Sequence, residues 1–411
     1  MNVARHSKRL LAALMASAIT VVDVHAAVTD IYNQPLATTS SVVAKPNVMF
    51  ILDNSGSMAD ANMPDDMSDS NAYGYKSAQC NGVAFDPSLA YPAPIKADGT
   101  SYPDANFNAA ASDGYVAIVS RASTSSIAVG TGSKTANIPS AGGTSYNVGD
   151  QVVITSTADA TVWMSGTVTD WNTLSSKNLI VNVTGSSGSG TFASWTVSLA
   201  ADLNNSTYYN YTGSQPRMNW TYNSSGTLQT STFTSECKAT SGTSVFTTVT
   251  LTNASTATDK QKYANWYSYY RTRRLMMRTA AGRAFATLNS NFRVGFTTIS
   301  DTGVTNGTNK FVDIGDFDTA KKTAFYNSLY TATGTSNTPL RASLAKVGRY
   351  FANKAPGQAS DPMQYSCQRN YAILSTDGYW NTGSETASYG PFQLTSNTAV
   401  GQQDAGEVKP M

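Results

Sequence analysis

Three short segments of the chain are almost continuously apolar and predict buried β-strands. They are residues 48–52, 292–299 and 371–375. A strand that is covered on both faces of a sheet has no polar side, so such runs are typical of parallel sheets in α/β proteins. The segments between them carry apolar residues at helical spacing. This alternation of strands and helices predicts a doubly wound, Rossmann-like α/β fold.

Three amphipathic helices are predicted, each from a start signal and an apolar stripe. The first follows Asp259 as N-cap, and its stripe is Trp266, Tyr270, Met277, Ala281, Ala284 and Leu288. The second follows Asp318 and turns Phe325 and Leu329 inward. The third opens at Thr338-Pro339, because proline suits the first helical position. Its stripe is Leu340, Leu344, Val347 and Phe351.

A block poor in charge interrupts this pattern after the first strand. Residues 107–258 hold 11 charged side chains in 152 positions, whereas residues 259–354 hold 20 in 96, which predicts a boundary near residue 259. Within the block, four short segments alternate like strands between turn-forming residues: 148–155, 160–168, 178–184 and 195–199. They predict a small antiparallel barrel or sandwich, an all-β module at about residues 115–200.

The first 26 residues have the pattern of a secretory signal peptide. Arg5, Lys8 and Arg9 precede a mostly apolar stretch at 10–22, and Val24-His25-Ala26 offers small residues for cleavage. The alternative is a buried first helix. Export implies an oxidising compartment. The chain has three cysteines, Cys80, Cys237 and Cys367, whose pairing stays open.

Composition excludes several classes of chemistry from the mature chain. The two histidines, His6 and His25, both lie in the predicted signal peptide. Without imidazole there is no Ser-His-Asp or Cys-His catalysis, no histidine-ligated zinc and no histidine base. Removal of residues 1–26 also brings the formal charge to zero, which gives no global reason to expect nucleic acid as a partner. No later apolar run reaches the ~18 residues of a transmembrane helix.

Oxygen-bearing side chains follow two predicted strands and open one helix. The first strand runs into Asp53-Asn-Ser55-Gly-Ser57, where two hydroxyls and a carboxylate suit a hard divalent cation. Thr338 starts the third helix and Asp377 follows the last strand. Alone, Thr338 fits an N-cap and Asp377 a turn. Together the three loops lie at one sheet edge, where ligands bind in open α/β sheets.

Three other groups of residues each allow a structural or a ligand-binding interpretation. An acidic run, Asp60, Asp65, Asp66 and Asp69, fits a solvated loop or a secondary cation site. Residues 259–354 carry 15 basic and 5 acidic side chains. The arginines of the first helix fit its solvated face or a surface for anionic polymers: Arg271, Arg273, Arg274 and Arg278. Helical spacing turns Trp266 and Tyr270 inward and leaves Tyr267 and Tyr269 as an outward pair that could contact glycans.

The three loops resemble the metal-ion-dependent adhesion site of von Willebrand factor type A domains. Longer stretches resemble the N-terminal region of PilY-type proteins, type IV pilus tip adhesins and biogenesis factors of Gram-negative bacteria. These stretches are 47–58, 87–115, 265–277, 293–299 and 370–381. The resemblance covers most of residues 30–115 and 260–405, and it leaves the β module at 148–199 unexplained.

The resemblance implies a metal site made of Asp53, Ser55, Ser57, Thr338 and Asp377, with magnesium expected and calcium or manganese as alternatives. A partner carboxylate would complete the coordination, so pilins, minor pilins and acidic protein ligands are the expected partners. The expected location is the periplasm, the outer-membrane surface or the pilus tip. The chain is expected to be non-enzymatic and to act in pilus assembly and surface or host-cell attachment.

The same resemblance divides the chain into four parts. Residues 1–26 are the signal peptide, 27–58 begin the von Willebrand factor A domain, 59–258 are an insertion, and 259–411 continue the domain. The family continues past the loop that holds Asp377 into further strands and a C-terminal β-propeller. This domain is therefore expected to be incomplete, as the product of a truncated gene, a fragment or a split reading frame. The alternative functions are a secreted metal-dependent hydrolase, or a binder of anionic polymers or glycans through the basic helix or the β module.

Overall fold

The computed structural model describes residues 44–378, except 140–145, 172–176, 242–243, 302, 306–309 and 335–336. The chain divides into two units, Met1–Ala44 and Lys45–Met411, and the described elements belong to the second. The predicted signal peptide and residues 379–411 lie outside the described residues. Within the described part, no helix has the length and apolar character needed to cross a membrane.

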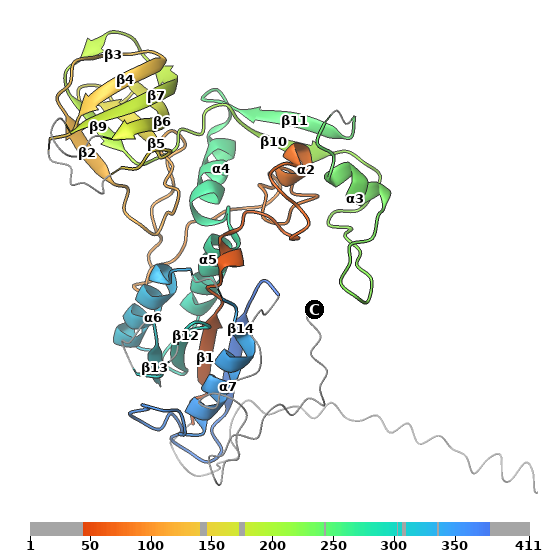
Figure 1. Ribbon diagram of the computed structural model, residues 1–411. Helices are drawn as coiled ribbons and strands as arrows, with labels where there is room; N and C mark the ends of the chain where they lie inside the picture. The colour runs from red at the N-terminus through yellow and green to blue at the C-terminus, as the bar shows by residue number, and fades with distance from the viewer. Residues whose placement is uncertain are drawn as a thin grey trace, which may run out of the picture. The chain divides into compact units, whose positions relative to one another are not determined.

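A four-stranded sheet forms the centre of the α/β part, in the order β13-β12-β1-β14 (Figure 1). The strands are β1 (Asn47–Leu52), β12 (Arg293–Thr298), β13 (Val312–Asp316) and β14 (Asn370–Ser375). β1 pairs in parallel with β12 and β14. All three predicted strands are therefore present. β13, which runs antiparallel to β12, was not predicted, because its five residues alternate too briefly to stand out.

Helices cover both faces of this sheet. The side chains of β1 alternate between the two faces, so the strand contributes to a core on each side. Val48, Phe50 and Leu52 pack with residues of α5 (Arg273–Ala286) and α6 (Thr319–Thr331). Met49 and Ile51 pack on the other face with residues of α7 (Leu340–Phe351). The continuous apolar run predicted from the sequence thus reflects a strand that is buried on both sides.

The helix starts agree in part with the predictions. Asp318 caps α6, since its carboxylate accepts a hydrogen bond from the Lys321 amide at 2.9 Å. The single helix predicted after Asp259 is two helices, α4 (Ala257–Tyr269) and α5, whose N-caps are Thr256 and Thr272. Asp259 instead lies in the first turn of α4. The predicted stripe of α7 is wrong at Leu344, which is 47% exposed.

A six-stranded antiparallel sheet lies between residues 120 and 198. Its order is β2-β9-β5-β6-β7-β4. Its strands are β2 (Ser120–Ser123), β4 (Gly132–Asn137), β5 (Gln151–Ser156), β6 (Trp163–Trp171), β7 (Asn178–Ser187) and β9 (Trp195–Ser198). A separate pair joins β3 (Ile127–Ala128) to β8 (Thr191–Phe192). The four strands predicted here correspond to β5, β6, β7 and β9. Trp195, fully buried, lies in the apolar core of this sheet.

A third group of elements is joined by a disulfide between Cys80 and Cys237. It contains the hairpin of β10 (Ser206–Tyr211) and β11 (Phe246–Leu251), with short helices α2 (Ala72–Tyr75) and α3 (Thr232–Cys237). Both cysteines are buried with aromatic neighbours, whereas Cys367 is exposed and unpaired. The structure therefore selects one pairing that the sequence left open.

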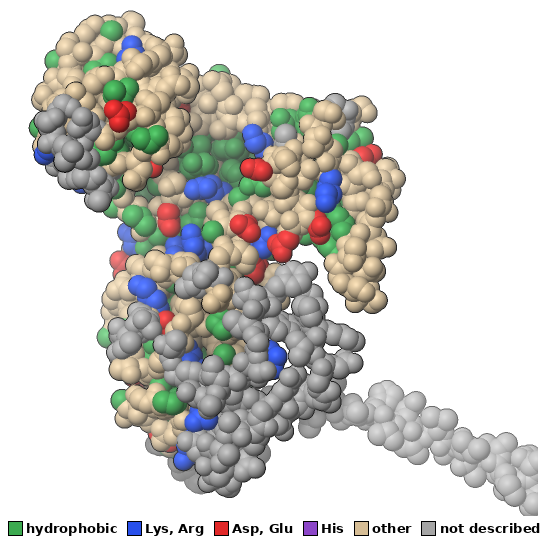
Figure 2. All heavy atoms as spheres, in the orientation of Figure 1, with side chains coloured by type: hydrophobic (Ala, Val, Ile, Leu, Met, Phe, Trp, Pro, Cys, Tyr) green, Lys and Arg blue, Asp and Glu red, His purple; other side chains and the backbone are tan. Residues whose placement is uncertain are grey.

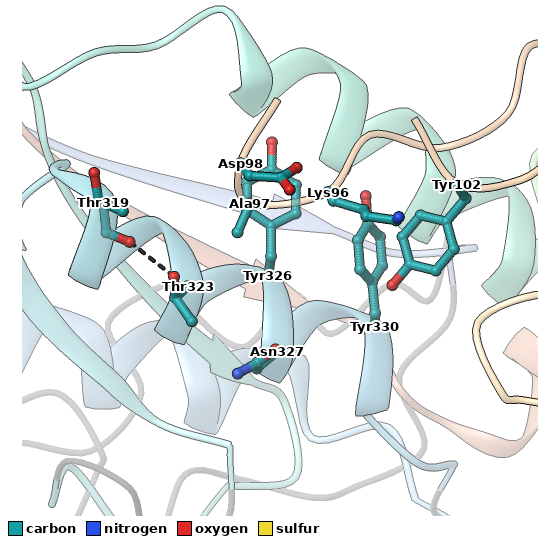
Figure 3. Close-up of a pocket in the computed structure, with 9 residues that line it drawn as sticks. All are labelled: Lys96, Ala97, Asp98, Tyr102, Thr319, Thr323, Tyr326, Asn327 and Tyr330. Carbon is teal, nitrogen blue, oxygen red and sulfur yellow. Dashed lines mark hydrogen bonds between the residues drawn. The ribbon is translucent and has the colours of Figure 1, made fainter. Parts of the chain in front are cut away.

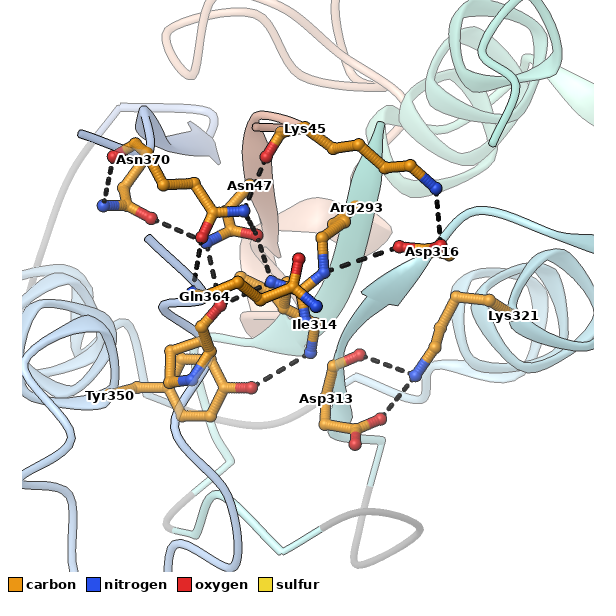
Figure 4. A network of polar contacts seen from close by, with 12 residues as sticks. Lys45, Asn47, Arg293, Asp313, Ile314, Asp316, Lys321, Tyr350, Gln364 and Asn370 are labelled. Atoms are coloured by element: carbon orange, nitrogen blue, oxygen red, sulfur yellow. Dashed lines mark hydrogen bonds and ion pairs between the residues drawn. The ribbon is translucent and has the colours of Figure 1, made fainter. Parts of the chain in front are cut away.

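A polar network links the amino-terminal ends of β1, β12 and β14 to the carboxyl end of β13 (Figure 4). Arg293 donates a hydrogen bond to Asn47 Oδ1 at 2.8 Å, and Asn47 Nδ2 donates to Asn370 Oδ1 at 2.8 Å. Arg293 Nε also lies 3.6 Å from Asp316 Oδ1 on β13. These contacts connect all four strands at the end of the sheet opposite the carboxyl ends of β1, β12 and β14.

Candidate metal site

The first loop of the candidate site leaves the carboxyl end of β1 and turns at once into a short 3-10 helix, Gly56–Ala59. Asp53 is fully buried, and its amide donates to Ser375 O at 3.0 Å, so the loop starts in register with the end of β14. Asp53 Oδ1 accepts a hydrogen bond from the Ser55 amide at 2.8 Å. Ser55 is buried and Ser57 is half-buried, while Gly56 is exposed. The loop thus has one side open to solvent.

The two serine hydroxyls lie at a distance that suits a shared cation. Ser55 Oγ and Ser57 Oγ are 3.2 Å apart. Neighbouring ligands of an octahedral Mg²⁺, each bound at 2.0–2.1 Å, are roughly 2.9 Å apart. The pair therefore needs only a small shift to occupy adjacent coordination positions. Its donors, together with the nearby carboxylates, are hard oxygens of the kind that Mg²⁺, Mn²⁺ and Ca²⁺ prefer.

The second loop follows β14 and is tied directly to the first. Thr376 Oγ1 donates to Asp53 Oδ2 at 2.7 Å and accepts from the Gly378 amide at 3.1 Å. Asp377, whose side chain is 5% exposed, lies between these two residues. The structure thus brings the Asp53-to-Ser57 loop and the loop that carries Asp377 to one edge of the sheet. Thr376 was not singled out from the sequence, because a hydroxyl in a loop carries no distinctive spacing.

Thr338 lies just before α7 and is buried. The N-cap of α7 is Pro339, so the interpretation of Thr338 as a simple N-cap is wrong. Leu340, two residues on, packs in the same core as Ile51 of β1 and Leu374 of β14. Thr338 therefore immediately precedes the N-cap of the helix that covers the strands from which the two loops emerge.

Two residues that were not predicted to belong to the site hold its loops in place. Asn54 Nδ2 donates to Ser300 Oγ and to Thr333 O, each at 2.8 Å, and so connects the first loop to the segments after β12 and α6. Arg273 Nη1 donates to Asp377 Oδ2 at 2.8 Å, and its Nη2 pairs with Asp65 Oδ1. Burial alone would lower the pKa of the Arg273 guanidinium, but its hydrogen bonds to Asp377 and Asp65 outweigh burial and raise that pKa.

Two of the four aspartates in the acidic run after the first loop lie beside basic side chains. Asp65 contacts Arg273, and Asp66 Oδ1 lies 4.0 Å from Lys238 Nζ. Across the residues that the structure describes, no three His, Cys, Asp or Glu side chains come together as a metal site. Asp60, Asp65 and Asp69 are exposed, which fits the solvated loop.

The arginines of the basic helix are not one solvated face. Arg273 and Arg278 are 5% and 4% exposed, and Arg278 pairs with Asp113 at 3.2 Å, so that interpretation is wrong for both. The helix begins at Arg273, which pairs with Asp65 and Asp377, so two of the arginines are used in contacts within the chain. On the described part of the face in Figure 2, basic and acidic side chains are interspersed, without a continuous basic patch.

The prediction that Tyr267 and Tyr269 both point outward is wrong for Tyr269. Tyr269 is 3% exposed and donates to Pro103 O at 2.8 Å, because residues from 102 to 115 pack against the end of α4. Tyr267 is half-buried, and the Arg271 guanidinium lies 4.6 Å from the centre of its ring. Tyr269 is thus a core residue and offers no surface for a glycan.

A separate pocket of about 350 Å³ lies between α6 and the segment around residues 96–102 (Figure 3). Its aromatic residues are Tyr102, Tyr326 and Tyr330, and its polar rim includes Lys96 and Asn327. The hydroxyls of the two α6 tyrosines donate to backbone carbonyls, Tyr326 to Gly282 O at 2.7 Å and Tyr330 to Ile95 O at 2.6 Å. Both of these tyrosines are buried, and the Tyr330 ring stacks on Tyr115 at 4.4 Å, so the pocket offers a ligand mainly the half-buried Tyr102 ring and the rim side chains.

Three curated proteins match the chain, and each is named type IV pilus biogenesis factor PilY1 from Pseudomonas aeruginosa. The chain is 27% identical to that of strain PAK over 413 residues, which cover 95% of this chain and 28% of the relative. It is 27% identical to that of strain UCBPP-PA14 over 392 residues, 92% of this chain and 27% of the relative. The third match, from strain PAO1, is 34% identical over 140 residues, 30% of this chain and 12% of the relative.

These matches confirm the predicted relationship to PilY-type proteins. The chain spans about a quarter of the length of the curated relatives that it matches over most of its own length. No family model matches the chain. No solved structure matches it either.

Proposed function

We propose that the chain takes part in type IV pilus biogenesis and in attachment, through a metal-ion-dependent adhesion site on a von Willebrand factor A domain. The relatives named as pilus biogenesis factors support the first part. Three features of the sheet support the second: the parallel pairing of β1 with β12 and β14, helices on both faces, and oxygen-rich loops at the carboxyl ends of β1 and β14. The chain is proposed to be an exported, non-enzymatic protein of the periplasm, outer-membrane surface or pilus tip.

The observation that carries the proposal is the arrangement of Asp53, Ser55 and Ser57 beside the Asp377 loop. Ser55 and Ser57 would hold the cation directly, with Thr338, while Asp53 and Asp377 would act through bound water or as ligands. A bound Mg²⁺, Mn²⁺ or Ca²⁺ would supply a Lewis-acidic centre that accepts a carboxylate. Ser57 is the serine of the pair with the more accessible side chain, so it marks the side from which a partner would approach.

Charge explains why that partner would be acidic. Asp377 already pairs with Arg273, so the two aspartates do not fully offset a dication. A cation held here keeps residual positive charge on the solvent side, where an acidic group of a pilin, a minor pilin or another surface protein would bind.

Calorimetric titration of Mg²⁺ and Mn²⁺ into the full chain tests the proposal. We expect binding by the wild type, no measurable binding by Asp53→Ala, and a loss of at least tenfold in affinity for Ser57→Ala. Asp159→Ala, at an exposed carboxylate in the six-stranded sheet's loops, is the matched control and should bind like the wild type. A folded Asp53→Ala variant with unchanged affinity would exclude this site.

A second candidate function, saccharide binding, is supported by the pocket beside α6. The half-buried ring of Tyr102, with the Asn327 amide and the Lys96 ammonium at the rim, suits the apolar and hydroxyl faces of a sugar. Titration of a panel of monosaccharides, followed by tyrosine fluorescence, tests this use. Asn327→Ala should weaken binding, and Asp53→Ala should leave it unchanged. If no sugar changes the fluorescence of the wild type, this candidate fails while the metal site is unaffected.

A further inference from the structure

Arg273 joins three segments of the chain at the candidate metal site. It is the first residue of α5, and its side chain is 4% exposed. Its amide donates to Asp60 O at 3.0 Å and its Nε donates to Asn62 O at 2.6 Å. Its two terminal nitrogens contact the carboxylates of Asp65 and Asp377. A single guanidinium thus links the segment after the first loop, the loop after β14 and the start of a helix.

The contacts differ on the two sides of this guanidinium. Asp377 is buried, with a side chain 5% exposed, whereas the Asp65 side chain is 54% exposed. Arg273 uses one oxygen of Asp377, Oδ2, at 2.8 Å. A buried carboxylate oxygen needs a hydrogen-bond donor, because a polar group left unpaired away from water costs free energy. Arg273 therefore holds the Asp377 carboxylate in a fixed orientation.

We propose that Arg273 is a positioning residue of the cation site, which sets cation affinity by holding the Asp377 carboxylate in place. The inference rests on the proposed metal site. Arg273 does not touch the cation and acts through Asp377. Asp65 offsets the charge of Arg273 from the solvent side, which limits the repulsion between the guanidinium and a dication.

The chemistry of arginine explains why this side chain suits the role. Its planar, rigid fork presents several N–H donors at once, and its charge persists at any physiological pH. Partners that hydrogen-bond to metal-ligating carboxylates orient those ligands, and their removal typically costs 10- to 100-fold in metal affinity. A lysine would keep the charge but could not reproduce the separate contacts to Asp377, Asp65 and Asn62 O.

A competing role for Arg273 would change the cation affinity in the opposite direction. If Arg273 merely competed with the cation for Asp377, its removal would free the carboxylate, remove a positive charge and raise the affinity. The direction of the change in Mg²⁺ affinity therefore separates the two roles.

The test is calorimetric titration of Mg²⁺ into Arg273→Gln and Arg273→Lys, with Arg293→Gln as matched control. Arg293 is also buried and paired with a carboxylate, but at the opposite end of the sheet. We expect a 10- to 100-fold loss of affinity for Arg273→Gln, a smaller loss for Arg273→Lys, and wild-type affinity for Arg293→Gln. Affinity that is unchanged or raised in Arg273→Gln overturns the inference.

Two further measurements distinguish positioning from general destabilisation. In an Asp377→Asn background, Arg273→Gln should cause no further loss, because the residue acts through that carboxylate. Without any metal, Arg273→Gln should speed hydrogen exchange at the Gly378 amide while Arg293→Gln does not. An undiminished effect in the Asp377→Asn background would contradict the assignment.

Asp65→Asn keeps the test possible if Arg273→Gln fails to fold, since Asp65 is mostly exposed. Loss of this exposed partner should lower Mg²⁺ affinity by up to about fivefold, the range for a surface ion pair. Unchanged affinity in Asp65→Asn would count against the inference. A wild-type chain that binds no cation overturns the proposed function itself, whereas binding that is insensitive to Arg273 overturns only this assignment.

Discussion

The hydroxyl of Thr376 donates a 2.7 Å hydrogen bond to Oδ2 of Asp53, across the carboxyl ends of the neighbouring strands β14 and β1. The other oxygen of Asp53 accepts from the Ser55 amide at 2.8 Å. Both oxygens of this fully buried carboxylate therefore have partners within the chain. The orientation of Asp53 is set by the protein before any cation binds, which is what a preorganised site requires.

Replacement of Thr376 by valine should destabilise the chain and weaken cation binding. Valine keeps the shape of threonine but removes the donor to a buried carboxylate, which costs about 1–3 kcal/mol. Urea unfolding measures the loss in the free energy of unfolding, and Mg²⁺ titration measures the loss in affinity. Thr376→Ser, which retains the hydroxyl, should stay close to wild type in both. Equal stability of the valine and serine variants would show that the hydrogen bond contributes little.

The disulfide between Cys80 and Cys237 should contribute strongly to stability, because it connects residues 157 positions apart. The chain-entropy model gives about 5 kcal/mol for a loop of this length, with 2–5 kcal/mol typical of native disulfides. We expect a Cys80→Ser, Cys237→Ser variant to melt at a markedly lower temperature by calorimetry. Cys367→Ser is the control, since that thiol is exposed and unpaired. Coincident melts of wild type and the double variant would rule out a stabilising role for the bridge.

A buried lysine near the carboxyl end of β12 should make the stability of the chain depend on pH. Lys346 on α7 is 1% exposed, and its Nζ donates to Thr297 Oγ1 at 3.0 Å and to Asp301 O at 2.5 Å. Burial lowers the pKa of Lys346 from 10.5 to about 8, although the negative charge of Asp301 raises it in part. The folded chain therefore releases this proton at a lower pH than the unfolded chain does.

The sign of the pH effect follows from this difference. Between about pH 8 and pH 10 the unfolded chain holds the Lys346 proton more often than the folded chain, so stability rises with pH in that window. One group contributes at most about 1.4 kcal/mol per pH unit. Urea unfolding at pH 7, 8, 9 and 10 measures the slope, which should diminish in Lys346→Met and persist in Lys354→Met, at an exposed lysine. A slope that Lys346→Met leaves unchanged would contradict this origin.

The sequence predicts an element well where one local pattern determines it. The run at residues 48–52 was recognised as a buried strand because apolar residues fill both of its faces. Asp318 is predictable as an N-cap because aspartate favours that position before an apolar stripe, and its carboxylate accepts a hydrogen bond from the amide three residues along. Tyr269 was misplaced because its burial depends on the segment from 102 to 115, which no local periodicity reveals. β13 was missed because five residues beside a parallel sheet resemble a loop.

The candidate site divides in the same way. By itself, the sequence determined which oxygen donors exist, Asp53, Ser55 and Ser57, and that they follow a buried strand, because strand burial and turn chemistry are local properties. Only the tertiary structure placed Arg273 against Asp377 and Thr376 against Asp53. Those pairs join positions 104 and 323 residues apart, and their geometry exists only once the register of β1, β14 and α5 is fixed.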